Sequence, residues 1–167
     1  ATRSRIPPLK NALISSFVRG FKPEMSDALE TDPMRYASFN AFFTRELRPD
    51  ARPMPADPRV IASPVDGTVS QIGIIEGGRM IQAKGHDFSL EALLAGPAKW
   101  TSRFSGGSFA TVYLAPYNYH RIHMPFGAEL HSAWYVPGRL FTVNNMTGAA
   151  RPGLFARNEP NGCMVQE

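Results

Sequence analysis

Two of the chain's four histidines, His120 and His123, lie three residues apart. They follow an apolar run over residues 109–114 that is typical of a buried β-strand. Histidine is the side chain whose ordinary pKa lies nearest to physiological pH, so a pair at a strand end suits proton transfer. Both histidines can equally be structural, and the spacing by itself leaves that alternative open.

Asp66 is the carboxylate that we expect to pair with His123. It lies in a tight Asp-Gly turn, and most such pairs serve only as turns. A turn carboxylate beside a strand-end histidine can orient the imidazole and raise its basicity. No Gly-x-Ser-x-Gly nucleophile motif occurs, and the one Gly-Ser step, Gly107-Ser108, enters an apolar strand. Local chemistry therefore predicts an Asp/His proton-transfer pair without a nucleophile.

Two other kinds of site compete with this interpretation. A metal site through His120 and His123 is not expected, because side chains at i and i+3 of a strand point to opposite faces and no third ligand is well placed. A biotinyl or lipoyl carrier domain would use Lys84 as its modified residue, since residues 63–69 resemble the strands of such carriers. The residues around Lys84 match a carrier hairpin poorly.

The composition indicates a globular chain with its own core. It has 167 residues, of which 43% are hydrophobic and 19% charged. Fifteen prolines and fourteen glycines favour strands and turns with few long helices. One cysteine excludes an intramolecular disulfide, and no apolar run reaches the roughly 18 residues of a transmembrane helix. The net charge of +4 is compatible with nucleic acid or an anionic membrane as a partner.

Residues 1–35 are predicted to form a basic, amphipathic helical region that associates with a membrane. Hydrophobic residues recur every three or four positions, and no acidic residue precedes Glu24. Such a helix can bury its apolar face in a lipid interface or pack it against its own domain, and periodicity alone does not choose between the two. The residues predicted to make the membrane contact are Ile6, Leu9, Lys10, Leu13, Phe17, Arg19 and Phe21.

Residues 36–167 are predicted to form a β-rich catalytic domain that is incomplete at its C-terminal end. A short helix is capped by Ser38, and the strand pattern begins at Val60. The expected fold class is mostly β (α+β), with an antiparallel sheet or barrel-like core after the N-terminal helical region. The expected strands are residues 68–75, 80–83, 109–114, 129–136 and the opening of one at 163–167, with a helix at 89–95.

Six stretches together resemble one family, the phosphatidylserine decarboxylases of the membrane-bound bacterial type. They occur in the family's order, and together they are highly specific although each alone is weak. The stretches are residues 36–47 with Arg52-Pro53, then 64–67, 82–96, 113–125, 135–138 and 154–159.

The resemblance implies a carboxy-lyase that removes CO2 from phosphatidylserine and leaves phosphatidylethanolamine. It also implies a covalent pyruvoyl cofactor, made when a serine in a Gly-Ser step of a proenzyme cleaves its own chain. The pyruvoyl group would be on a small α chain, and the partner would be a larger β chain. The family's Leu-Gly-Ser processing motif does not occur here, so this chain would be part of a β chain.

Carried over residue by residue, the resemblance assigns Asp66 and His123 to an Asp/His/Ser self-processing triad. His120 would contact the substrate or supply a proton after CO2 leaves. The residues that would form a pocket or lid for the lipid are Tyr135, Pro137, Gly138, Leu140, Phe141 and Val143.

The resemblance also favours the membrane interpretation of the N-terminal helix. It implies a peripheral or monotopic protein on the cytoplasmic face of the cell membrane. The expected partners are anionic phospholipid, phosphatidylserine and the α chain, with no nucleic acid, and a homodimer is compatible with them. The alternatives are a non-catalytic lipid-binding relative and the carrier domain.

Overall fold

The structure, a computed structural model, describes residues 2–82, 86–94, 98–135 and 161–166. By its internal contacts the chain divides into two compact units. The first unit comprises residues 1–68 and 112–127, and the second comprises residues 69–111 and 128–167. The predicted division at residue 35, between a membrane-associating helical region and a β-rich catalytic domain, stays a prediction.

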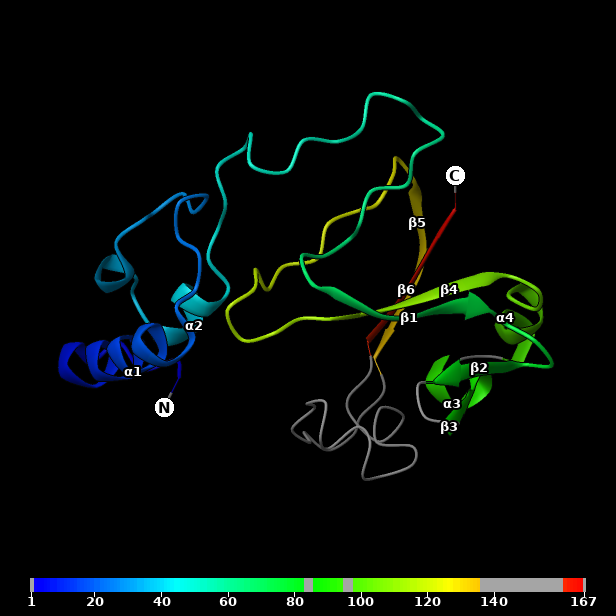
Figure 1. The fold of residues 1–167 in the computed structure, drawn as a ribbon, viewed down its shortest axis with the longest axis horizontal. Helices are drawn as coiled ribbons and strands as arrows, with labels where there is room; N and C mark the ends of the chain where they lie inside the picture. The colour runs from blue at the N-terminus through cyan, green and yellow to red at the C-terminus, as the bar shows by residue number, and fades with distance from the viewer. Residues whose placement is uncertain (1, 83–85, 95–97, 136–160, 167) are drawn as a thin grey trace. The chain divides into compact units, whose positions relative to one another are not determined.

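The first unit contains a long helix and a short one. Helix α1 (Pro7–Phe21) begins with two prolines, whose fixed φ suits a first turn, and ends at Lys22 in the left-handed conformation with φ of 48°. A 3₁₀ turn (Pro33–Arg35) leads to helix α2 (Phe39–Phe43), where the Ser38 hydroxyl accepts the N-cap bond from the Ala41 amide. Helix α2 lies against α1 (Figure 1).

The core of the first unit is aromatic. The Phe17 ring of α1 meets three rings of α2 edge-on, with centroids 5.3 to 5.8 Å apart: Phe39, Phe42 and Phe43. Ile14 and Phe42 have no exposed surface. The centre of the apolar face of α1 therefore packs on its own unit, which is one of the two uses that its periodicity left open.

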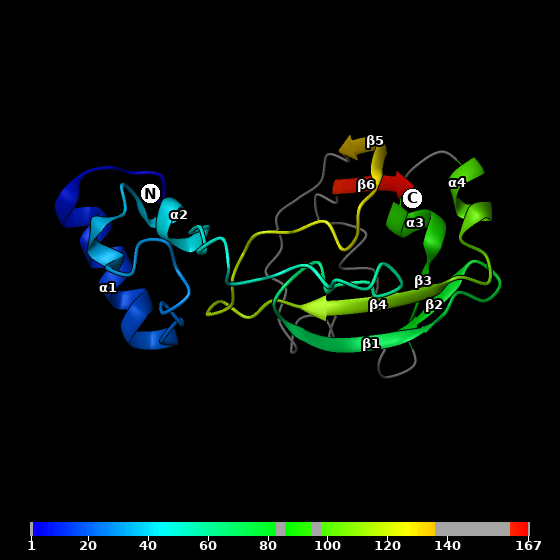
Figure 2. The ribbon, with the colours of Figure 1, turned by 90° about the horizontal axis from the view of Figure 1, so that it is seen from above.

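The second unit contains most of the strand residues. β1 (Thr68–Ile74) and β4 (Ser108–Tyr113) form a two-stranded sheet and run in opposite directions (Figure 2). β2 (Arg79–Gln82) pairs antiparallel with β3 (His86–Ser89). β5 (Glu129–Tyr135) pairs antiparallel with β6 (Asn161–Gln166).

The described residues of the second unit also include two short helices. α3 (Leu90–Leu94) contacts both β3 and α4 (Ala98–Arg103). The buried cluster here consists of Ile75, Met80 and Leu90, with Leu94 and Phe109 packed against it. The cluster joins the end of β1 to β2, α3 and β4, so apolar burial anchors the turn between β1 and β2.

The predicted α+β class with small antiparallel sheets is confirmed, whereas a barrel-like core stays a prediction. The strand pattern was expected to begin at Val60, and that expectation is wrong for residues 60–62, which are irregular. Pro58 and Pro64 flank this segment and donate no ladder hydrogen bonds, which disfavours a strand. Strand β3 and helix α4 were not predicted.

Candidate active site

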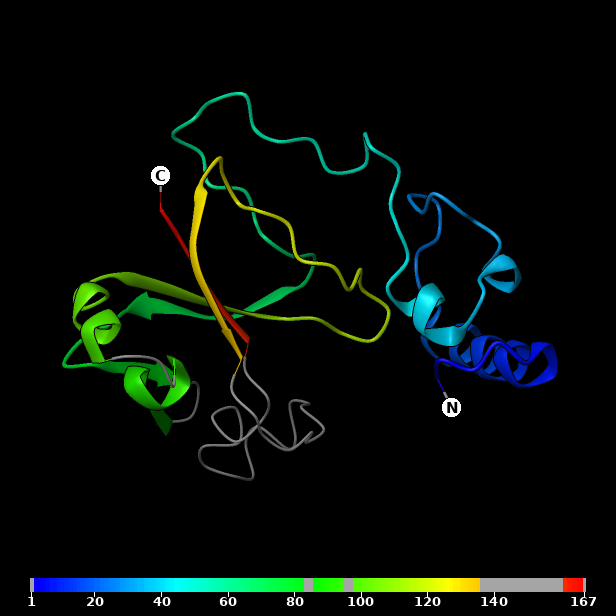
Figure 3. The same ribbon diagram turned by 180° about the vertical axis from the view of Figure 1, so that it is seen from behind.

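Two antiparallel segments of the first unit bring the predicted pair together. The Ala62 amide donates to the Pro125 carbonyl at 2.9 Å, and the His123 amide donates to the Pro64 carbonyl at 2.8 Å. The segments therefore run side by side, as Figures 1 and 3 show. These backbone bonds place His123 close to the turn that carries Asp66.

The turn itself requires glycine after Asp66. A Cβ atom at Gly67 would lie 2.6 Å from the carbonyl oxygen of Tyr113, closer than a real Cβ atom can approach. The Asp-Gly pair is therefore a turn packed closely against the chain. This close packing explains why residue 67 is glycine, whether or not Asp66 has a catalytic role.

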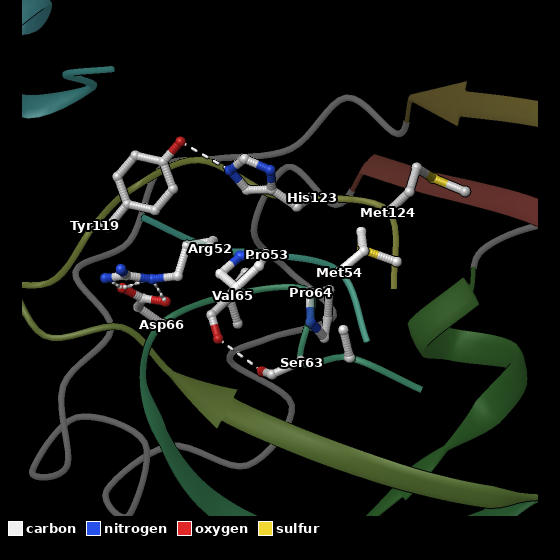
Figure 4. A pocket seen from close by; sticks show the side chains of 11 residues that line it. Arg52, Pro53, Met54, Ser63, Pro64, Val65, Asp66, Tyr119, His123 and Met124 are labelled. Atoms are coloured by element: carbon white, nitrogen blue, oxygen red, sulfur yellow. Dashed lines mark hydrogen bonds and ion pairs between the residues drawn. The ribbon is translucent and has the colours of Figure 1, made fainter. Parts of the chain in front are cut away.

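Asp66 and His123 line one pocket of about 480 Å³ (Figure 4). Most of the other lining residues are apolar, so a ligand there would meet a carboxylate and an imidazole set in apolar surroundings. The remaining lining residues are Arg52, Pro53, Met54, Ala62, Ser63, Pro64, Val65, Tyr119 and Met124.

Arg52 holds the Asp66 carboxylate. Its Nε lies 3.0 and 3.1 Å from the two carboxylate oxygens, and its Nη2 contacts Oδ2 as well. Its Nη1 donates to Asp27 Oδ2 at 2.9 Å, so one guanidinium joins two carboxylates. The hydrogen bonds from Arg52 are the main cause that lowers the pKa of Asp66 below its usual value, and Asp66 is ionised at neutral pH.

His123 has a different partner. Its Nε2 lies 2.8 Å from the hydroxyl of Tyr119, and its side chain is largely exposed to the pocket (Figure 4). Within the described residues, no hydrogen bond joins Asp66 to His123. The two residues share a pocket, but each is held by a second residue, and their direct pairing stays a prediction.

His120 lies outside the residues that line this pocket. Its ring stacks on Phe43 with centroids 4.0 Å apart, and its Nε2 donates to the Ala115 carbonyl at 3.1 Å. Burial is the main cause that lowers the pKa of His120, so the ring is neutral at pH 7. Its predicted part in substrate contact or proton supply stays a prediction.

A second, more polar pocket of about 330 Å³ shares Arg52, Tyr119 and His123 with the first. The sequence interpretation did not assign a role to Arg52 or Tyr119. Both lie in stretches that carry the family resemblance, and Tyr119 directly precedes His120. The other residues that line the second pocket are Glu46, Leu47, Arg48, Pro49 and Arg121.

The predicted lid residues are mostly outside the described part of the chain. Tyr135 is the last residue of β5 and is exposed. Pro137, Gly138, Leu140, Phe141 and Val143 lie outside the described residues, and so does Lys84 of the carrier alternative. In the part of the chain that the structure describes, no group of three or more histidine, cysteine or acidic residues is arranged to hold a metal ion.

The predicted membrane residues divide into two sets. Ile6, Leu9, Arg19 and Phe21 are exposed. Leu13 and Phe17 are half-buried, and the Lys10 ammonium donates to the Asn11 side chain at 2.7 Å and to the Met34 carbonyl at 2.6 Å. The four exposed residues are accessible to a lipid surface, whereas Phe17 packs on other rings of the unit and Lys10 is hydrogen-bonded within it.

An ionised carboxylate and an imidazole line one largely apolar pocket, and groups of these two types can transfer protons. The family model for phosphatidylserine decarboxylase matches residues 39–167. The chain belongs to the phosphatidylserine decarboxylase family.

Two relatives illustrate how far the similarity extends. The phosphatidylserine decarboxylase proenzyme of Bordetella avium (strain 197N) is 55% identical over 161 residues, which are 96% of this chain and 55% of the relative. The proenzyme of Azotobacter vinelandii (strain DJ / ATCC BAA-1303) is 51% identical over 160 residues, 96% of this chain and 56% of the relative. The chain thus spans about half the length of the curated relatives it matches.

Proposed function

We propose that this chain is part of the β chain of a phosphatidylserine decarboxylase, which removes CO2 from phosphatidylserine to leave phosphatidylethanolamine. The observation that carries the proposal is the convergence of Asp66 and His123 on one pocket with apolar walls. A non-catalytic, lipid-binding relative has no need for an ionised carboxylate beside an imidazole. The family match to residues 39–167 supports the same conclusion.

The residues present fit the self-processing that yields a pyruvoyl group. His123 is exposed in the pocket, so its imidazole is accessible to a serine hydroxyl from the α-chain segment, and it would take the serine proton. Asp66 is held as a carboxylate and would stabilise the resulting imidazolium. The pyruvoyl group, when bound, supplies a ketone that accepts electrons during decarboxylation.

This role requires a change in the hydrogen bonds of Asp66. In the described structure the carboxylate is paired with Arg52, and the imidazole with Tyr119. The Asp66 carboxylate can accept more hydrogen bonds than those from Arg52, so a rearrangement that brings imidazole Nδ1 to it does not require Arg52 to leave. We also propose that the strands of the complete protein close into a barrel-like core and that the predicted lid covers the lipid.

The test of the function is a denaturing intact-mass spectrum of the full-length protein after expression, together with a decarboxylation assay on phosphatidylserine. We expect two chains, the smaller with a blocked, carbonyl-bearing first residue, and release of CO2 with formation of phosphatidylethanolamine. A full-length protein that remains one chain, has no carbonyl-reactive terminus and releases no CO2 would contradict the proposal.

We propose that the protein associates peripherally with the cytoplasmic face of the membrane through the outer surface of α1. No helix in the described ranges is long and apolar enough to cross a bilayer. Ile6 and Leu9 are 62% and 41% exposed at the start of α1, and exposed arginines lie close by in the sequence, at positions 3 and 5. Apolar side chains beside cations suit the interface of an anionic membrane.

Changing Ile6 and Leu9 together to aspartate is expected to weaken binding to anionic vesicles at least about tenfold, because each apolar side chain contributes about 1.5–3 kcal/mol when fully buried. Sedimentation with phosphatidylglycerol-containing vesicles measures this. Leu29→Asp is the matched control, since Leu29 is 61% exposed and lies outside α1. Equal binding of the double variant and the control would overturn the proposed surface. Phe17 is unsuitable for this test, since it packs in the core.

A further inference from the structure

The Tyr119 hydroxyl is placed to control the ring of His123. The hydroxyl lies 2.8 Å from His123 Nε2, and the ring centroids are 5.5 Å apart (Figure 4). Tyr119 is only 5% exposed, whereas His123 opens to the pocket. A buried phenol needs a hydrogen-bond partner, and here that partner is the imidazole itself.

The backbone around Tyr119 is held by several bonds. Asn118 closes a turn, because its amide donates to the Ala115 carbonyl at 2.9 Å and its side chain accepts from the Ala115 amide at 2.7 Å. The guanidinium of Arg45, which is 3% exposed, donates to the Tyr117 carbonyl at 3.4 Å and to the Glu24 carbonyl at 3.2 Å. These bonds fix the backbone on which Tyr119 lies, and so they fix the position of its hydroxyl.

The direction of this hydrogen bond decides which ring nitrogen carries the proton. A neutral imidazole has one donor and one acceptor nitrogen. If the phenol donates to Nε2, the ring proton is on Nδ1, the nitrogen that a carboxylate such as Asp66 can accept from. Nε2 is then the basic nitrogen, which is the one needed to take a proton from a nucleophile.

We propose that Tyr119 is a positioning residue that donates to His123 Nε2 and holds the neutral ring in the tautomer protonated on Nδ1. Among the residues that the structure describes, Tyr119 is the one group that hydrogen-bonds this ring. The phenol occupies Nε2 until the hydroxyl of a processing serine displaces it, so Tyr119 sets the tautomer of the ring before the serine binds. This inference rests on the proposed function only where self-processing is concerned.

The test is Tyr119→Phe in the full-length protein, which removes one oxygen and keeps the buried ring. Tyr117→Phe is the matched control, since Tyr117 is 49% exposed and lies two residues away. Nitrogen-15 spectra of labelled histidine side chains report the tautomer of His123 directly. We expect Nδ1 to be protonated in the parent protein and in Tyr117→Phe, and a mixture of tautomers in Tyr119→Phe.

Self-processing supplies a second measurement. Loss of one hydrogen bond is expected to slow chain cleavage about five- to tenfold in Tyr119→Phe and to leave Tyr117→Phe unchanged. An unchanged His123 tautomer in Tyr119→Phe would overturn the inference, even if the variant were less stable or slower. A changed tautomer in a protein that never cleaves itself would support the positioning role and contradict the proposed function.

Discussion

Replacing His123 with alanine in the full-length proenzyme is expected to leave the protein as one uncleaved chain. In the proposed mechanism the imidazole takes a proton from a serine hydroxyl, and general-base catalysis contributes roughly 10²–10⁴-fold to a rate. At that reduced rate we expect much more uncleaved precursor than in the parent protein after the same incubation. Gel electrophoresis and intact-mass measurement after timed incubation at neutral pH would follow the precursor.

The control for this change is His131→Ala, because His131 lies on β5 and is not among the residues that line either pocket. It is expected to cleave at the parent rate. Both variants should keep the circular dichroism spectrum of the parent, since the side chains of His123 and His131 are exposed. Normal α and β chains from His123→Ala would remove His123 from the processing step and leave Asp66 without its proposed partner.

Phe42→Ala is expected to lower the free energy of unfolding by about 3–5 kcal/mol, the range found for fully buried phenylalanines. Phe42 has no exposed surface and packs with Phe17, Tyr36 and Phe39, with centroids 5.7 to 6.1 Å apart. Its ring also lies 6.0 Å from the guanidinium carbon of the buried Arg45. Because domains are stable by only about 5–15 kcal/mol, this loss is a large share of the total.

Urea unfolding followed by circular dichroism measures this effect. The matched control is Phe21→Ala, because Phe21 is 46% exposed and its ring contacts the same cluster through Phe17, with the two rings tilted and their centroids 4.7 Å apart. We expect the control to lose less than about 1.5 kcal/mol, since little apolar area is uncovered. Equal losses for the two variants would show that the aromatic cluster does not carry the stability of this unit.

Local patterns predicted much of the secondary structure. The strands that became β1, β2, β4, β5 and β6 and the helix that became α3 were expected within about one or two residues of their observed ends, because apolar periodicity and turn residues act over short distances. Helix α1 was expected only as part of a helical region over residues 1–35. β3 was missed because its four residues are too few to show a clear hydrophobic pattern, and the strand is defined by its pairing with β2. Residues 60–62 were expected to start the strands, although the prolines on either side disfavour a ladder.

The candidate site was also predicted only in part. The residue types in the sequence, and the resemblance of their motifs, were enough to single out Asp66 and His123, and the structure brings both to one pocket. Sequence spacing argued only against joint metal ligation by His120 and His123. The structure places His120 outside the residues that line that pocket, and its catalytic role stays a prediction. Neither argument pointed to Arg52 or Tyr119.

The sequence by itself determined which side chains are available for chemistry and which face of α1 is apolar. The tertiary structure decided what each of them touches. Asp27, Arg52 and Asp66 are far apart in the sequence and come together only when the chain folds, and Arg52 then binds both carboxylates. Likewise Phe17 packs inward because α2 supplies facing rings. Periodicity defines the direction of a side chain within its own element, whereas hydrogen bonds and burial depend on which distant segment is placed opposite.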